Sequence, residues 1–356
     1  MKLITTTFLC AALWLALITT MHGSLNLKWF TKKVVGAAAA GDKLRVGFIP
    51  VTCHQTCPVT DFINKQTNNG GILEPVRFNG FPELKEAFLS GYMPATFILA
   101  PLAMSLREQG VPLKIVYLGH RDGTAMMVHK DSKIFRIEDL KGKRIAVPNR
   151  YSNQRLLLFK ALRERGMNIK ELEIVEMPPP DMPAALYSKA VDAITSGEPF
   201  MAQTEMDGYG RILYLTKDVW PNFISCVLAV HEDAIKNRRA DVQQLVDGIA
   251  KSGRWLDQSI DHRMDAGEFV ATKYYNQNPK LLQYVLSKPP DRVKYTNLNV
   301  VRKDLEEIES LGMEAGILNG SIGFDDYADP SFVTDDSQVK PWDWAGLKDV
   351  KVTPAK

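Results

Sequence analysis

The sequence lacks any run of lysine and arginine residues, and its formal net charge is only +3. Binding to nucleic-acid phosphates depends on clustered basic side chains, so no nucleic-acid partner is expected. The sequence also has no internal repeat and no low-complexity block. Hydrophobic residues make up 45% and charged residues 24% of the 356 residues, which is typical of a globular chain. A chain of this length exceeds one compact core, so two lobes are expected.

Motifs of catalysis are missing as well. The sequence contains no nucleophile elbow, no phosphate-binding glycine loop and no paired metal-binding motif. We therefore expect a protein that is not an enzyme and that uses no cofactor.

Cysteine is scarce, with four residues in the chain. Cys10 follows Leu9 within an apolar run, whereas lipid attachment to an exported cysteine needs a small residue before it, so acylation is not expected. Cys53, Cys57 and Cys226 remain for the globular part. An oxidising compartment would permit a disulfide among them.

Residues 1–42 are predicted to be an export signal or N-terminal anchor with a linker. Met1 and Lys2 precede an apolar, uncharged run over 3–21, as in signals for export. The run approaches the length of a membrane span and three lysines follow between 28 and 33, so an uncleaved anchor in the membrane stays open. In either case we expect the globular part to begin near residue 43 and to be periplasmic or otherwise extracytoplasmic.

Short apolar runs alternate with amphipathic segments from residue 44 onward. This rhythm predicts an α/β fold with mostly parallel sheets that helices cover on both faces. Strands are expected at 44–50, 75–78, 95–100, 113–118, 124–129, 144–147, 173–177, 191–195 and 223–230. Helices are expected at 59–66, 82–91, 102–109, 152–166, 182–189, 239–258, 263–275, 280–286 and 302–315.

The rhythm restarts after residue 122, which predicts two lobes. Lobe one is discontinuous and comprises 43–122 and 226–340, lobe two comprises 123–225, and 341–356 form a tail. The two crossings between the lobes would form a hinge of two strands. Ligands of open α/β sheets bind beyond the carboxyl ends of the strands, so the strand ends should line a cleft that closure can seal.

Several segments resemble the nitrate/sulfonate/taurine (NMT1/THI5-like) group of ABC-transporter solute-binding proteins, and within it the nitrate- and bicarbonate-binding branch. They are Leu44 to Thr52, Ile98 to Ala103, Glu138 to Pro148 (EDLKGKRIAVP), Pro178 to Leu186 (PPPDMPAAL) and Val191 to Phe200 (VDAITSGEPF). The resemblance implies the two-lobed fold of a type II periplasmic binding protein. It also implies a role in capturing a small polar or anionic solute.

The loop after the first strand contains Thr52, Cys53, His54 and Cys57. In the resembled group this loop touches the ligand, but two cysteines and a histidine replace its usual sequence here. Three interpretations stay open. Cys53 and Cys57 form a disulfide, they are buried free thiols, or Cys53, His54, Cys57 and Glu198 hold a soft or borderline metal ion.

Other candidate ligand-binding residues follow the remaining strand ends. They are Asn79, Phe81, Ala100, Pro101, His120, Asn149, Tyr151, Ser152 and Glu198. Ser152 opens a helix, so it can cap the helix or face an anion at its N-terminus. In the bicarbonate-binding relatives a glutamate at the position of Glu198 contributes to the site. Its alternative is a structural salt bridge at the hinge.

These observations predict the extracytoplasmic solute-binding component of an ABC importer, a monomer whose partners are a small-molecule ligand, a permease and its ATPase. Two alternatives remain open. One is a metal- or cofactor-dependent enzyme on the same fold, related to a protein that makes a thiamine precursor. The other is a membrane-tethered solute sensor.

Overall fold

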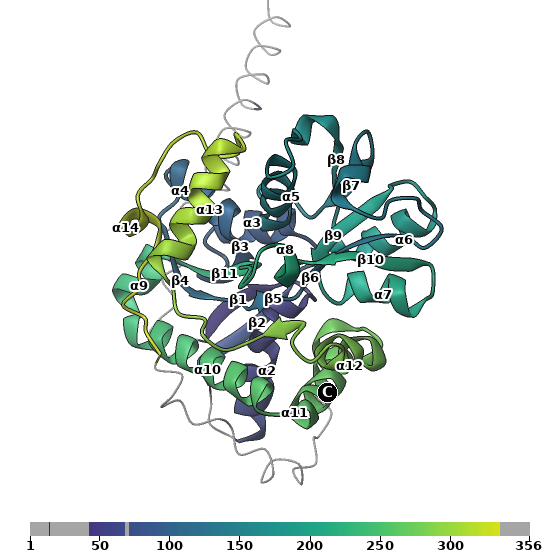
Figure 1. Ribbon diagram of the computed structural model, residues 1–356. Coiled ribbons are helices and arrows are strands. Elements are labelled where there is room, and N and C mark those ends of the chain that lie inside the picture. The colour runs from purple at the N-terminus through teal and green to yellow at the C-terminus, as the bar shows by residue number, and fades with distance from the viewer. Residues whose placement is uncertain (1–13, 15–42, 68–70, 335–356) are drawn as a thin grey trace, which may run out of the picture.

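The structure is a computed structural model that describes residue 14 and residues 43–67 and 71–334 (Figure 1). Apart from Trp14, the predicted export signal or anchor at 1–42 lies outside the described residues, as does the predicted tail at 341–356. No helix within the described ranges is both long and apolar enough to cross a membrane.

The first sheet has five strands in the order β2-β1-β3-β11-β4. These strands are β1 (Leu44–Phe48), β2 (Leu73–Arg77), β3 (Ala95–Leu99), β4 (Leu113–Leu118) and β11 (Cys226–His231). β1 is parallel to β2 and β3, whereas β11 is antiparallel to β3 and β4. β3 is buried along its whole length, as expected for a strand with both faces covered.

The second sheet has five strands in the order β10-β6-β9-β7-β8. They are β6 (Thr124–His129), β7 (Arg144–Val147), β8 (Glu173–Glu176), β9 (Ala193–Gly197) and β10 (Gly210–Leu215). β7 is parallel to β8 and β9, and β6 is antiparallel to β9 and β10. The sequence did not predict β10. It is an edge strand that is mostly half-buried, so its hydrophobic pattern is weak.

Helices surround both sheets, so the predicted two-lobed α/β class is confirmed (Figure 1). Elements of the first lobe include α2 (Thr56–Gln66), α3 (Phe81–Leu89), α4 (Ala100–Glu108), α9 (Glu232–Asn237), α10 (Arg239–Gln258), α11 (Ile260–Val270) with the π-helical turn η5 (Ala271–Tyr275), α12 (Pro279–Ser287), α13 (Arg302–Glu314) and α14 (Phe324–Tyr327). Those beside the second sheet are α5 (Asn153–Arg163), α6 (Met182–Tyr187), α7 (Phe200–Met206) and α8 (Thr216–Val219). Most predicted helices differ from these bounds by up to three residues at an end.

Three segments of chain meet where the polypeptide passes between the sheets. β5 (Arg121–Asp122) leads to the second sheet, and Ile224, just before β11, leads back. β12 (Val293–Lys294) pairs with β5, and Arg121 bridges to Ile224. The sequence predicted two crossings but not the contribution of β12, which comes from a distant part of the chain.

Arg121 has a structural role at this crossing. Its Nη2 donates to the carboxylate of Asp304 at 2.8 Å, and its Nε and Nη1 donate to the carbonyl oxygens of Asn297 and Asn222 at 3.0 and 3.1 Å. The guanidinium therefore joins α13 and two loops to the strand that leaves the first sheet.

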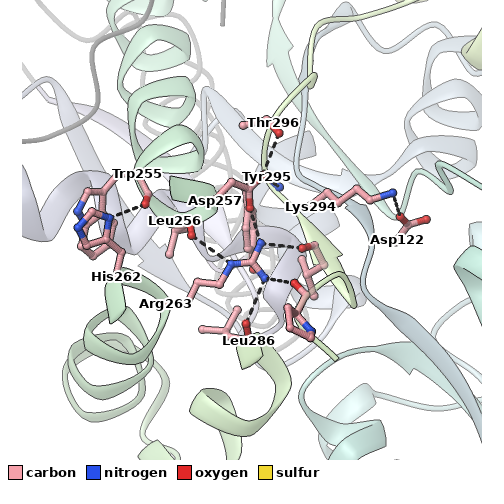
Figure 2. Close-up of polar contacts among 12 residues, drawn as sticks. Asp122, Trp255, Leu256, Asp257, His262, Arg263, Leu286, Lys294, Tyr295 and Thr296 are labelled. Atoms are coloured by element: carbon pink, nitrogen blue, oxygen red, sulfur yellow. Dashed lines mark hydrogen bonds and ion pairs between the residues drawn. The ribbon is translucent and has the colours of Figure 1, made fainter. Parts of the chain in front are cut away.

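A second buried arginine anchors the helices that lead into β12 (Figure 2). The side chain of Arg263 is 7% exposed and donates to Asp257, whose other oxygen accepts from Tyr295 N–H at 2.8 Å. The guanidinium also donates to the carbonyl oxygens of Leu256, Leu286, Pro290 and Val293. One side chain thus ties α10, α11 and α12 to the segment that reaches the crossing.

We predict that Arg263→Ala lowers the free energy of unfolding by roughly 3–5 kcal/mol, because it removes the cation paired with the Asp257 carboxylate and the donor to four carbonyl groups. Urea unfolding measures this loss. Arg136→Ala is the control, because the Arg136 side chain is 74% exposed and pairs with Glu138 and Asp139 on the surface. Its loss should stay below about 1 kcal/mol. Equal losses in the two variants would contradict the anchoring role of Arg263.

Candidate functional site

The loop between β1 and α2 carries the first group of site residues. It turns through a short 3-10 helix over Thr52–His54. Thr52, Cys53, His54 and Gln55 are all at most 2% exposed. Four side chains with polar or nucleophilic atoms are therefore buried together at the end of a strand, where the sequence predicted contact with a ligand.

The position of His54 is fixed by a backbone donor and two aromatic rings. Ile49 N–H donates to His54 Nδ1 at 2.8 Å, so in the neutral ring Nδ1 carries the lone pair and Nε2 carries the proton. The ring stacks on Phe97 and meets Phe81 edge-on. His54 Nε2 finds no hydrogen-bond partner within 43–67 and 71–334. It is a buried donor with nothing to donate to.

His120 lies against the same loop. Its Nε2 is 3.1 Å from Thr52 Oγ1, and Tyr295 packs edge-on against the ring. Burial lowers the pKa of His120 more than the nearby Cys53 and Asp122 raise it, so the ring is neutral. Gly123 makes room for it, because a Cβ atom there would lie 2.6 Å from His120 Cε1.

The end of β9 brings the second sheet to the same loop. Thr52 N–H donates to the Glu198 carbonyl oxygen at 2.7 Å. A Cβ atom on Gly197 would lie 3.9 Å from both Cys53 Sγ and Ser225 Oγ. The strand ends of the two sheets therefore meet directly, with Gly197 at the point of contact.

Glu198 is fully buried but has charged and polar partners. Its Oε2 accepts from Ala202 N–H at 2.8 Å, and its Oε1 lies 3.4 Å from Arg292 Nη1. Burial raises the pKa of Glu198, and Arg292 opposes that rise. Of the two predicted roles, this geometry matches the structural salt bridge. The carboxylate therefore does not require a cationic ligand.

The start of α5 supplies two residues that the sequence reasoning missed. Ser152 Oγ caps the helix by accepting from Arg155 N–H at 3.2 Å. Asn153 Nδ2 donates to the Ile224 carbonyl oxygen, and Gln154 Nε2 donates to Ser225 Oγ at 3.4 Å. The side-chain oxygens of Asn153 and Gln154 have no hydrogen-bond partner in the described part of the chain. Their position directly after the predicted cap was the available signal.

Gln55 was missed in the same way, next to the predicted loop residues. Its Oε1 accepts from Tyr295 O–H at 3.1 Å, whereas its Nε2 has no partner among the described residues. Together with His54, His120, Asn153 and Gln154, it places unsatisfied donors and acceptors from both sheets in one buried region.

The cysteines are arranged differently from the predicted Cys53–Cys57 pair. Cys53 Sγ lies 3.1 Å from Cys226 Sγ, and all three described cysteines are free thiols. Cys57 sits in α2, where burial and the nearby Asp61 raise its pKa. The loop geometry therefore places Cys53 beside the start of β11 rather than beside Cys57.

The predicted metal ligands are not brought together as a set. A compact group is formed by Cys53, His54 and Cys226, with one donor atom of each within 4.8 Å of the others. Cys57 and Glu198 are not part of it. The lone pair on His54 Nδ1 already accepts from Ile49 N–H, so the ring has no free nitrogen for a metal ion.

The other predicted ligand-binding residues differ in how far they are exposed to solvent. Asn79 is exposed, whereas Phe81 is buried against His54. Asn149 and Tyr151 are half-buried, and Asn149 Oδ1 accepts from Tyr151 N–H at 2.8 Å within a local turn. Ala100 and Pro101 are buried in the first turn of α4, beyond the end of β3.

The sequence of this chain is similar to those of several known proteins. The Synechocystis sp. bicarbonate transport ATP-binding protein CmpC is 26% identical over 219 residues, which cover 56% of this chain and 32% of that protein. The chain thus spans about a third of the first curated relatives it matches. A putative aliphatic sulfonates-binding protein of Escherichia coli is 24% identical, with 79% of this chain and 86% of that protein covered.

A solved structure and a family model also match the chain. The zinc-bound ligand-binding component of an ABC-type import system from Staphylococcus aureus matches with a TM-score of 0.74 and 25% identity. The match covers 84% of this chain and 99% of that one. The model of the NMT1-like family matches residues 37–271, which is more than half of the sequence. The chain therefore belongs to the NMT1-like family.

Proposed function

We propose that this protein is the extracytoplasmic solute-binding component of an ABC importer and that it captures one small polar solute between its two sheets. The observation that carries the proposal is the set of buried, unsatisfied polar atoms at the meeting strand ends. A buried donor or acceptor without a partner is unfavourable by roughly 1–3 kcal/mol. Native proteins leave few of them, and a cluster marks a place where another molecule supplies the partners.

The chemistry of these atoms favours a solute with both donors and acceptors. His54 Nε2 and Gln55 Nε2 offer hydrogen, whereas the side-chain oxygens of Asn153 and Gln154 accept it. The buried charged groups beside these atoms have partners of opposite charge, since Glu198 faces Arg292 and Asp122 lies 3.0 Å from Lys294. A neutral solute, or an anion that carries a proton, matches this lining better than a strongly charged one.

Transport, rather than catalysis, agrees with the relatives and with the N-terminal sequence. The E. coli relative is named as a binding protein, and the S. aureus structure as the ligand-binding component of an import system. The apolar run over 3–21 supports export, with either cleavage or retention as an anchor. A permease and its ATPase would then receive the solute at the membrane.

Native mass spectrometry of the protein purified from its own host tests the proposal. We expect one bound small molecule per chain, released by mild denaturation in unmodified form. A released molecule that has been chemically converted during incubation with the protein would instead indicate an enzyme.

We predict that Gln154→Ala weakens binding of the co-purified solute by about 5- to 100-fold, because it removes an acceptor from the buried site. Isothermal titration calorimetry measures the change. Gln109→Ala is the matched control, since Gln109 is exposed just after α4 and donates to Ser105 Oγ within the same segment. An unchanged affinity in Gln154→Ala would show that α5 does not line the site.

We also predict that stability falls as the pH falls below about 6.5, the pKa of an unperturbed histidine. Below that value the unfolded chain binds a proton at His120 that the native state excludes, because burial lowers the pKa of His120 in the folded protein. Glu198 acts in the opposite direction, since its raised pKa favours proton uptake by the native state.

Comparison with His120→Asn isolates the contribution of His120. Urea unfolding of both proteins at pH 5.5 and 7.5 should show a smaller loss in the variant, by up to about 1.4 kcal/mol per pH unit. The same loss in both proteins would mean that His120 takes up a proton as readily in the native state as in the unfolded chain.

A further inference from the structure

Cys53 and Cys226 form a buried thiol pair that the solute site does not explain. They are 173 positions apart in the sequence, yet their sulfur atoms lie 3.1 Å from each other. Both residues are at most 2% exposed. A disulfide needs an S–S distance of about 2.05 Å, so a movement of about 1 Å would bond the two sulfurs.

The backbone at Gly119 allows the two cysteines to lie close together. Gly119 N–H donates to the Cys226 carbonyl oxygen at 2.8 Å. A Cβ atom on Gly119 would collide with the carbonyl oxygen of Cys53 and would lie 3.2 Å from that of Cys226. The backbones of both cysteines therefore pack against Gly119. This backbone packing, and not the sulfur contact alone, holds the two cysteines close together.

A metal ion does not account for the pair. Two thiolates on a tetrahedral zinc ion lie about 3.7 Å apart, given Zn–S distances of ~2.3 Å, and the observed separation is shorter. His54, the third member of the compact group, accepts from Ile49 N–H at Nδ1, and in that tautomer its Nε2 carries a proton and offers no lone pair to a metal ion. The group thus has two sulfur ligands and no free nitrogen.

The surroundings favour a reactive Cys53. Burial disfavours its thiolate, but the hydrogen bond from Cys226 stabilises it and helps to hold the pKa of Cys53 well below its ordinary value. Burial and the contact with Cys53 raise the pKa of Cys226. Thiol–disulfide exchange begins from a thiolate, so this asymmetry makes Cys53 the attacking sulfur.

We propose that Cys53 and Cys226 form a reversible disulfide at the base of the solute site, with a disulfide-containing oxidant such as oxidised glutathione or an oxidised dithiol protein as the co-reactant. The Cys53 thiolate attacks one sulfur of the oxidant, whose S–S bond breaks and whose other sulfur leaves as a thiolate. Cys226, once deprotonated, attacks Cys53 Sγ in the mixed disulfide, and the second oxidant sulfur leaves. The oxidant gains two electrons, and the two cysteine protons end on its two thiols.

This bond would act on the solute site directly. Cys53 stands between Thr52 and His54, and Cys226 follows Ser225, which contacts Gln154 of α5. Oxidation would join the β1 loop to the strand that returns from the second sheet. The loop after β1 and the start of β11, which contact both the solute site and the second sheet, would then move together.

Peptide mapping of the full chain tests the proposal without knowledge of the solute, so it stays separate from the transport function. The reduced native protein is equilibrated with oxidised and reduced glutathione, alkylated, digested without reductant and analysed by mass spectrometry. We expect the Cys53 and Cys226 peptides to be linked in the wild type and in Cys57→Ser, the matched control for a buried thiol. Cys226→Ser and Cys53→Ser should lose the link.

Thermal unfolding provides a second readout. A disulfide across so long a loop should raise Tm by on the order of 5 °C or more in the oxidised wild type and in oxidised Cys57→Ser. The Tm of Cys226→Ser should be the same before and after the oxidising treatment. Free Cys53 and Cys226 in the equilibrated native protein, a Cys53–Cys57 link, or a lower Tm on oxidation would each overturn the proposal.

Discussion

The hydrogen bond from Thr52 N–H to the Glu198 carbonyl oxygen joins the first loop of one sheet to the end of a strand in the other. Once these backbones are in contact, the side chains beside them are excluded from water. His120 is then neutral, because burial lowers its pKa, and the buried Glu198 carboxylate is paired with Arg292. Closure of the two sheets therefore determines the protonation and the hydrogen-bonding needs of the whole site.

In the proposed function, closure and solute binding are energetically coupled for this reason. Unsatisfied donors and acceptors oppose burial, so the closed arrangement is favoured when a solute provides their partners. When the sheets separate, water can satisfy the same atoms. A structure with buried, unpartnered atoms on both sides of one contact thus has the features of a closed binding protein, and the thiol pair lies at the point where the two sides touch.

Much of the fold could be predicted because buried strands and amphipathic helices have strong local patterns. The rule that ligands lie beyond strand ends also led to Thr52, His54 and His120, which the structure buries where the two sheets meet. The features that the sequence did not predict depend on contacts between residues far apart in the chain. Cys226 and Arg292 meet their partners only after the chain has crossed between the sheets twice, and no spacing in the sequence reports that. β10 was missed because an edge strand has little buried surface to shape its sequence.

The measurement that tests the solute-dependent closure most directly is small-angle X-ray scattering of the protein before and after removal of its co-purified solute. Closure around the solute predicts a larger radius of gyration for the solute-free protein, and a return to the smaller value when the solute is added back. A radius that stays the same, with a solute that still raises Tm, would show that the two sheets remain in contact whether or not the site is filled.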